Sequence, residues 1–495
     1  MRISIGVCFA LTLMGADSRE ERWPQFRGPD GRGIGGDQAV LPSEFGPSKA
    51  LLWKTPLPLG HGSPCIWGNR IFVTAFDPEA KKLEVIAVDR QNGSIAWRSP
   101  IPASEIESVH GQSSPATSTP VTDGERIYVY SGSFGLAAYR WDGKLAWEHP
   151  MGVAKSPYGS GASPLLLGDL ILIARDFPPE PYFLAVSRKD GKVAWKVELP
   201  KSSQPGPKTS HSTAVRFGDQ VVLNRPGEVS GYSPSDGKRL WWMAVASPGT
   251  STPSPGDGVL YVTAYNMGAD PAGAVTLPPY ADALAKYDAD KNGKLSATEA
   301  PANDLYFRRR AGMPDNIPGA HFTIKLFFRF IDRNQDGFVD EAEYAGVGNF
   351  FARGGSGPAH GLLAIRPSGV GEQTGALAWA EPRSVPEVST PLEYRGRVYM
   401  VTAGGIFTCV DAKSGKLIYR GRVNAPGAYY ASPVAAGGKI FVASAEGVVT
   451  VLGGGAELEV LANNDLGEPV TGTPAPAGSA LYVRSARHLW AFGGK

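Results

Sequence analysis

Two twelve-residue segments carry oxygen-bearing side chains at the spacing that a calcium ion requires. Both have Asp at position 1, Asp or Asn at positions 3 and 5, Gly at 6 and Glu at 12. Calcium prefers about seven oxygen ligands; position 7 gives its backbone carbonyl, position 9 binds directly or through water, and Glu at 12 gives two oxygens. The predicted ligands are Asp288, Asp290, Asn292, Lys294, Ser296, Glu299, Asp332, Asn334, Asp336, Phe338, Asp340 and Glu343.

These segments, residues 288–299 and 332–343, match the EF-hand pattern at every diagnostic position. A single DxDxNG stretch can be an acidic surface turn, but two complete loops close together favour a pair of calcium sites. Apolar residues at helical spacing before each loop predict flanking helices, and Leu295 and Val339 at position 8 predict a contact between the loops. Loop 2 has four acidic ligands and loop 1 has three, which predicts tighter binding at loop 2.

The rest of the chain is repetitive. A turn glycine followed four positions later by an aromatic residue recurs six times, as Gly93/Trp97, Gly143/Trp147, Gly191/Trp195, Gly237/Trp241, Gly375/Trp379 and Gly415/Tyr419. Asn-Gly and Asp-Gly between apolar runs are typical of β-hairpins, because glycine accepts the positive φ of the turn. A second element, Ser or Thr then Pro before a β-rich strand, opens each unit at Pro64, Pro120, Pro164, Pro253, Pro391, Pro433 and Pro474, with Ala214 as a variant.

Eight openings predict an all-β fold, an eight-bladed β-propeller of four-stranded antiparallel blades. The eighth unit ends at Lys495 without its last strand, whereas a spare strand lies around Trp53. We expect this N-terminal strand to complete the last blade and close the ring, which removes an open sheet edge. Seven blades or a partly open ring are the alternatives.

The fifth unit is interrupted. The first four turn glycines are 46–50 residues apart, but Gly237 and Gly375 are 138 apart. The loops therefore belong to a small all-α EF-hand pair inserted in blade 5, at residues 270–357. We expect propeller at 50–269 and 358–495, and an N-terminal segment at 19–49.

Residues 1–18 have the pattern of a secretory signal peptide. Arg2 is followed by a largely apolar run of 13 residues, Ile3 to Gly15, then small residues and charge. This predicts export to the periplasm or medium, with no membrane span in the mature chain. Cys65 and Cys409 are interpreted as small buried side chains, with a disulfide bridge as the alternative.

Charge and composition narrow the classes of partner. Lysine plus arginine (49) nearly balances aspartate plus glutamate (47), and there is no basic run that would indicate nucleic-acid binding. GxSxG, HExxH, CxxC and phosphate-binding glycine motifs are missing from the sequence. We expect a monomer.

The repeat resembles the pyrroloquinoline-quinone-type (PQQ-like) propeller repeat. The opening from Trp23 to Pro29, WPQFRGP, is similar to that of exported bacterial PQQ-like propeller proteins. The family includes PQQ-dependent alcohol and glucose dehydrogenases and a non-enzymatic lipoprotein that helps to insert outer-membrane proteins. The resemblance implies that the turn tryptophans pack between blades. It also implies a disulfide of adjacent cysteines against PQQ in the alcohol dehydrogenases, which this chain lacks.

Two functions follow from these patterns. The first is an exported calcium-binding scaffold or interaction protein; the alternative is a PQQ-dependent oxidoreductase, so enzymatic activity stays open. His61, His110 and His211 each lie just before a blade's first strand. They are expected at one mouth of the central channel, as a pocket for a small molecule or a partner's loop, or as histidines that bond loop backbone. A hydrolase or lyase at this mouth is a third, unspecific possibility.

Overall fold

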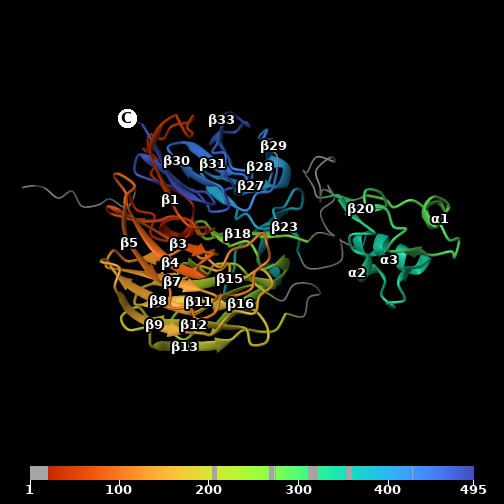
Figure 1. Cartoon of the computed structure of the whole chain (residues 1–495), viewed down its shortest axis with the longest axis horizontal. Helices are drawn as coiled ribbons and strands as arrows, with labels where there is room; N and C mark the ends of the chain where they lie inside the picture. Colours follow the sequence, from red (N-terminus) through yellow and green to blue (C-terminus); the bar gives the residue numbers. More distant parts are fainter. Residues whose placement is uncertain are drawn as a thin grey trace, which may run out of the picture.

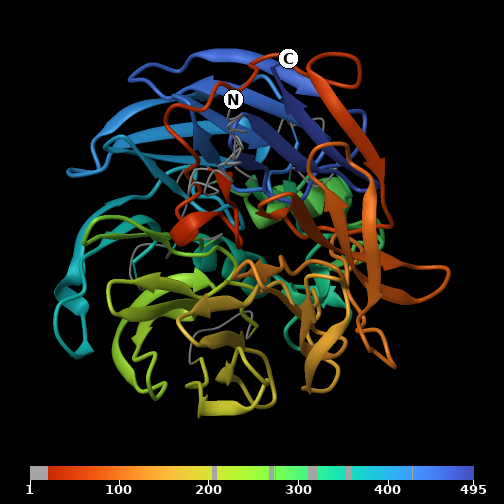
Figure 2. The same cartoon turned by 90° about the vertical axis from the view of Figure 1, so that its left-hand side faces the viewer.

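The computed structural model describes residues 21–202, 209–266, 273, 275–309, 321–352, 359–425 and 427–494. Within this part of the chain, eight four-stranded sheets form a closed β-propeller. Figure 2 shows the sheets arranged around a central axis. The predicted fold class and blade number are confirmed. The signal-like residues 1–18 lie outside the described residues.

The strands follow the chain from the first blade to the eighth. Blades 1 to 4 are β2 (Cys65–Trp67), β3 (Arg70–Asp77), β4 (Lys82–Asp89), β5 (Ile95–Pro100); β6 (Val121–Thr122), β7 (Arg126–Ser131), β8 (Gly135–Arg140), β9 (Leu145–Pro150); β10 (Leu165–Leu167), β11 (Leu170–Arg175), β12 (Tyr182–Ser187), β13 (Val193–Glu198); and β14 (Val215–Phe217), β15 (Gln220–Tyr232), β16 (Arg239–Pro248), β24 (Gly371–Glu372). Blades 5 to 8 are β17 (Ser254–Pro255), β18 (Leu260–Ala264), β23 (Gly361–Ile365), β25 (Leu377–Glu381); β26 (Leu392–Tyr394), β27 (Arg397–Thr402), β28 (Ile406–Asp411), β29 (Leu417–Arg422); β30 (Val434–Ala436), β31 (Lys439–Ala443), β32 (Val448–Gly453), β33 (Val460–Asp465); and β34 (Ala475–Ala477), β35 (Ala480–Arg484), β36 (His488–Gly493), β1 (Leu51–Pro56).

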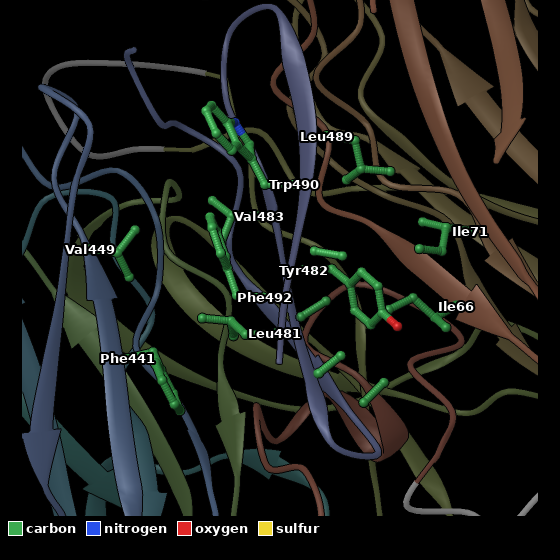
Figure 3. Packing of buried hydrophobic residues seen from close by; sticks show 14 of the residues in the cluster. Ile66, Ile71, Phe441, Val449, Leu481, Tyr482, Val483, Leu489, Trp490 and Phe492 are labelled. Atoms are coloured by element: carbon green, nitrogen blue, oxygen red, sulfur yellow. The ribbon is translucent and has the colours of Figure 1, made fainter. Parts of the chain in front are cut away.

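The two ends of the chain share the eighth blade, as predicted. Strand β1 pairs antiparallel with the C-terminal strand β36 and completes the sheet. Figure 3 shows the packing of this blade against both neighbours: Trp490 lies on the side of Val449 of blade 7, and Tyr482 lies on the side of Ile66 of blade 1. Strand β1 therefore covers the edge of β36 and gives the last blade the same number of strands as the other blades.

The Ser/Thr residues that open the blades form a closed ring of hydrogen bonds. In each blade the backbone N–H of this residue donates to the side-chain hydroxyl of its counterpart in the next blade, at 3.0–3.2 Å. The last bond, from Thr473 to Ser63, closes the circle. The members, all buried, are Ser63, Thr119, Ser163, Thr213, Thr252, Thr390, Ser432 and Thr473.

The turn glycines and tryptophans join the outer parts of neighbouring blades. Trp97 of blade 1 covers Gly143 of blade 2 so closely that a Cβ on this glycine would lie 2.7 Å from the indole, and its Nε1–H donates to Trp141 O at 3.0 Å. The same contact recurs for Trp53, Trp147, Trp195 and Trp379. The resemblance is thus correct that these tryptophans pack between blades.

Trp241 is the exception. It is fully buried, donates to Gln220 Oε1 at 2.6 Å within its own blade, and leaves Gly375 of blade 5 with no neighbour at its Cβ position. The chain just before Gly375 instead adds the short strand β24, which pairs parallel with β16. Trp241 still packs between blades, as the resemblance implies, because it shares an apolar cluster with Leu260 and Leu363 of blade 5; only its contact with the next turn glycine is missing.

The N-terminal segment crosses the propeller axis at the ends of the innermost strands (Figure 2, red). Its residues pair with Ile66 of blade 1 and Ala435 of blade 7, and Pro24 O accepts Thr122 N of blade 2. Arg27 is fully buried and donates to the carbonyl oxygens of Pro391 and Pro433 at 2.9 and 3.1 Å. Burial lowers the pKa of Arg27 to about 9. This segment, which includes the 3-10 turn η2 (Pro29–Gly31), covers one end of the channel.

The EF-hand insertion leaves blade 5 between β18 and β23 and forms a separate lobe (Figure 1). Its described elements are α1 (Tyr280–Tyr287), β19 (Leu295–Ser296), β20 (Tyr306–Arg309), β21 (His321–Thr323), α2 (Phe328–Ile331), β22 (Phe338–Val339) and α3 (Glu341–Ala352). The hairpin β20–β21 between the loops is a difference from the all-α module predicted. Its aromatic residues, such as Phe307 and Phe322, complete the apolar core of the lobe.

Cys65 and Cys409 are both free and buried, so the interpretation as small buried side chains is confirmed and the disulfide alternative is wrong. Burial raises the pKa of Cys409 to about 11. In the described residues, no helix is both long and apolar enough to cross a membrane.

Candidate calcium loops and channel mouth

Loop 1 folds around its acidic side chains. Asp288 follows α1 directly, and its carboxylate accepts the backbone N–H groups of Asn292 (3.2 Å) and Gly293 (2.9 Å). Glu299 reaches back from position 12 to accept Ala289 N–H at 3.0 Å. Gly293 has φ +79°, a left-handed conformation that glycine adopts without strain, and this lets the chain bend.

Loop 2 repeats this geometry residue for residue. Asp332 accepts Asp336 N–H (3.2 Å) and Gly337 N–H (3.0 Å), and Glu343 accepts Arg333 N–H at 2.8 Å. Gly337 has φ +85°. Two loops with unrelated residues at their variable positions therefore take one conformation, which their shared Asp, Gly and Glu determine.

The loops pair with each other through position 8. Leu295 of β19 and Val339 of β22 are register partners in a two-stranded antiparallel sheet, and both are fully buried. The predicted contact is confirmed. The helix expected before loop 2 is present as α2, which has four residues; Leu326 and Phe330, two of the apolar residues that predicted it, are 62% and 80% exposed.

The donor set fits a calcium ion. Side-chain oxygens of Asp288, Asp290 and Glu299 lie within 4.8 Å of one another, so one ion can contact all three. The groups are carboxylates, an amide and a hydroxyl, which are the hard oxygen ligands that calcium prefers over softer metals. In loop 1, the recorded donors to these carboxylates are uncharged: backbone N–H groups, the Asn292 amide (2.9 Å to Asp290) and the Ser296 hydroxyl (2.7 Å to Glu299).

Loop 2 has a cation beside its ligands. The ammonium Nζ of Lys294, at position 7 of loop 1, lies 2.8 Å from Oδ2 of Asp336, at position 5 of loop 2. This contact lowers the pKa of Asp336 and raises that of Lys294. The β19–β22 pairing brings the two together, because Lys294 precedes Leu295 and Asp336 lies just before β22.

Three connections between blades build the other end of the channel. The starts of the first strands, the ends of the second strands and the connections between blades share one end of each antiparallel sheet. This end, the channel mouth, faces away from the N-terminal segment. The connections 101–120, 151–164 and 199–214 are the long ones here, and they carry His110, Tyr158 and His211.

Two of the three predicted histidines meet at the mouth. The His110 and Tyr158 rings are 5.1 Å apart, and Tyr158 and His211 are 6.1 Å apart and edge-on. Burial lowers the pKa of His211 to about 4. The ring contacts of this cluster join His110, Tyr158 and His211, without His61. Burial and the nearby charge of Arg484 lower the pKa of His61 to about 4. Both histidines are therefore neutral at pH 7.

Sequence reasoning missed the buried charges of the mouth. Arg484, at the end of β35, is 1% exposed, and its Nε and Nη1 have no hydrogen-bond partner in the described chain. Glu107 is 3% exposed, and burial raises its pKa to about 7 although Ser160 and Arg175 oppose the shift. Of the twelve buried side-chain atoms without a partner in the described residues, eight belong to this end: Glu107 Oε2, Ser118 Oγ, Ser156 Oγ, Arg175 Nε, Asn224 Oδ1, Ser389 Oγ, and Nε and Nη1 of Arg484.

Comparison with known families gives two matches. The sequence model described as "Outer membrane protein assembly factor BamB" matches residues 43–177, 181–298 and 368–456. An EF-hand model matches residues 324–347, which include loop 2 but not loop 1. The EF-hand match suggests calcium as the ligand of the inserted module.

Individual relatives are distant but cover most of the chain. The outer membrane protein assembly factor BamB of Yersinia pestis is 20% identical over 431 residues, covering 82% of this chain and 89% of its own. A solved europium-containing methanol dehydrogenase has 12% identity and a TM-score of 0.56, covering 96% of this chain and 98% of its own. A quinohemoprotein alcohol dehydrogenase of Pseudomonas putida HK5 has 12% identity and a TM-score of 0.51, covering 96% and 80%. At these identities the two structures show the fold.

Proposed function

Since the chain belongs to the family of PQQ-like β-propellers whose model is described as outer membrane protein assembly factor BamB, we propose that it is a calcium-binding propeller scaffold. Both loops of the inserted EF-hand pair bind calcium, through the twelve ligands predicted above. The propeller carries the pair and offers its surface to a protein partner.

One observation carries this proposal. Two loops hold acidic side chains in the same arrangement, and their β19–β22 pairing fixes each loop against the other. Carboxylates held this close repel one another unless a cation lies between them. A divalent cation removes this repulsion, so binding stabilises the lobe by an amount that rises with the logarithm of the ratio of calcium concentration to the dissociation constant.

Calorimetric titration of the full chain with calcium tests the proposal. Wild type binds two ions, and Glu299→Gln and Glu343→Gln each lose one, with affinity at the altered loop falling by at least about a hundredfold because a ligand is removed. Glu341→Gln is the matched control: it lies exposed in the same helix as Glu343 but at a position that supplies no ligand. Wild-type protein that takes up no calcium, or Glu341→Gln that loses a site, contradicts the assignment.

Location and domain limits belong to the same proposal. The signal-like residues 1–18 and the name of the Yersinia relative both support export to the periplasm. We place the propeller at residues 50–269 and 358–495 and the insertion at 270–357, so that the insertion can be removed without cutting a blade strand. An exported chain meets calcium-rich surroundings, which favours permanently occupied, structural sites.

The channel mouth supports a second function, binding of a small anion-bearing molecule. The buried atoms without partners carry this candidate, above all the Nε and Nη1 nitrogens of Arg484, because such groups are costly unless a ligand or water bonds them. Arginine N–H groups suit carboxylates. PQQ, a tricarboxylate, is one such ligand, although the adjacent-cysteine disulfide implied for quinoprotein alcohol dehydrogenases has no counterpart here.

Thermal-shift titration with PQQ and with citrate tests this candidate. Saturable stabilisation of wild type that Arg484→Met abolishes supports an anion site at the mouth. Arg487→Met is the control, because Arg487 is exposed three residues away. Stabilisation by PQQ alone together with dye-linked alcohol oxidation supports the oxidoreductase, and no stabilisation by either compound contradicts the candidate.

A further inference from the structure

Lys294 lies in loop 1, but its side chain contacts loop 2. Its backbone carbonyl stands at position 7 of loop 1, where the loop pattern places a calcium ligand. Its side chain leaves that loop and ends 2.8 Å from a carboxylate oxygen of Asp336 in loop 2, with its ammonium 5.8 Å from the centre of the Phe338 ring. The corresponding residue of loop 2 is Phe338, which is uncharged, so position 7 of loop 2 places no cation beside loop 1.

This contact makes the loops electrostatically unequal. Loop 2 has four acidic ligands, Asp332, Asp336, Asp340 and Glu343, whereas loop 1 has three. In the described residues, no lysine or arginine is recorded within ion-pair distance of the loop 1 carboxylates, while Lys294 reaches loop 2. One positive charge therefore offsets the extra acid of loop 2, and counting acids alone overstates its advantage.

The charge acts on bound calcium whether or not the contact breaks. If calcium takes both oxygens of Asp336, the ammonium must leave. If it takes one, the ammonium stays within a few ångströms of a divalent cation and repels it. Because the Lys294 and Asp336 side chains are 40% and 35% exposed, water and salt weaken the repulsion without removing it.

We propose that Lys294 is an intramolecular competitor of calcium at loop 2, which lowers the affinity of that loop and brings it close to the affinity of loop 1. This inference rests on the proposed calcium function. The two loops then bind calcium over the same range of calcium concentration, whereas without this competition loop 2 would be occupied before loop 1.

The test isolates loop 2 in the full chain with Glu299→Gln. In this background, Lys294→Met raises the calcium affinity of loop 2 about three- to tenfold, as expected for removal of one partly screened charge near a divalent ion. Lys294→Arg keeps the charge and gives the parental affinity. Lys291→Met removes an exposed charge from the same loop, at a position without a recorded contact to Asp336, and changes the affinity less than twofold. In 1 M KCl the gain from Lys294→Met becomes smaller, because salt screens the charge.

The outcomes separate the inference from the function on which it rests. If wild type binds two calcium ions but Lys294→Met matches Lys291→Met, the competitor role is wrong and the calcium sites stand. If Lys294→Arg gains as much as Lys294→Met, the effect is one of shape and the electrostatic argument is overturned. If wild type binds no calcium, the proposed function itself fails.

Discussion

The ring of Ser and Thr residues and the channel mouth lie next to each other on the propeller axis, but they differ in whether their buried polar groups have partners. In the ring, each backbone N–H of the eight members finds a hydroxyl in the next blade. At the mouth, eight buried side-chain atoms have none among the described residues. Neutral, complete bonding suits a permanent structural joint, and incomplete bonding suits a site that water or a ligand completes.

The difference has an energetic consequence. A satisfied buried hydrogen bond stabilises the fold modestly, whereas a buried group without a partner destabilises it until something binds. Removing a polar group from the ring should therefore weaken the protein, and removing one from the mouth should strengthen it. Glu107 at the mouth and Thr119 in the ring allow this contrast to be tested with near-isosteric changes.

Of the two substitutions, Glu107→Gln should change the free energy of unfolding more. Burial raises the pKa of Glu107 to about 7, well above that of an unfolded carboxyl. Its protonated form is therefore the one that the fold favours, and stability is lost as pH rises from about 4.5 to 7, by up to about 3 kcal/mol. Glutamine stays neutral, so the variant should be more stable than wild type at pH 8 by about that amount, and equal to it near pH 4.5. Urea unfolding at the two pH values measures this.

Glu105→Gln is the matched control for the pH experiment, because Glu105 is exposed two residues away in the same connection. It should leave the pH dependence of wild type unchanged. If Glu107→Gln lowers stability at pH 8, the carboxylate has a partner that stabilises its charge. Glu107 would then not be an unsatisfied group, and the contrast between the mouth and the ring would fail.

Sequence patterns predicted the propeller well because the repeated residues are themselves the contacts between blades. The Ser/Thr of each opening makes a ring bond, and a turn glycine such as Gly143 makes room for the tryptophan of the blade before it. Trp241 fits the pattern but not the contact, because β24 occupies that junction, and no local signal marks a two-residue strand. Arg27 was also missed: its partners include backbone carbonyls 364 and 406 residues away, which have no sequence signature.

The calcium loops and the channel mouth also differ in how much of each could be predicted from the sequence. The EF-hand ligands are contiguous, so spacing alone predicted both loops and the Leu295–Val339 contact. The link from Lys294 to Asp336 depends on the register between loops, which spacing within a loop does not contain. At the mouth, the unusual length of the connections between blades 1 to 4 is the sequence signal that indicates a binding region. Arg484 comes from a strand whose side chains are otherwise apolar or aromatic, apart from this charge at its end, and only the closed ring brings it to the mouth.

Thr119→Val tests the ring, with the smaller expected effect. Thr119 Oγ1 accepts the backbone N–H of Ser63 at 3.0 Å, and both residues are 2% exposed. Valine fills nearly the same space but accepts no hydrogen bond, so the Ser63 N–H stays buried without a partner and unfolding becomes easier by about 2 kcal/mol. Thr374→Val, at an exposed threonine outside the ring, should change stability by less than about 0.5 kcal/mol. Because the ring bonds involve no titrating group, the loss at Thr119 should be the same at pH 5 and pH 8, unlike the effect at Glu107. A Thr119→Val protein as stable as wild type would mean that the backbone N–H of Ser63 has another acceptor, and that the ring bond adds little to the apolar packing between blades.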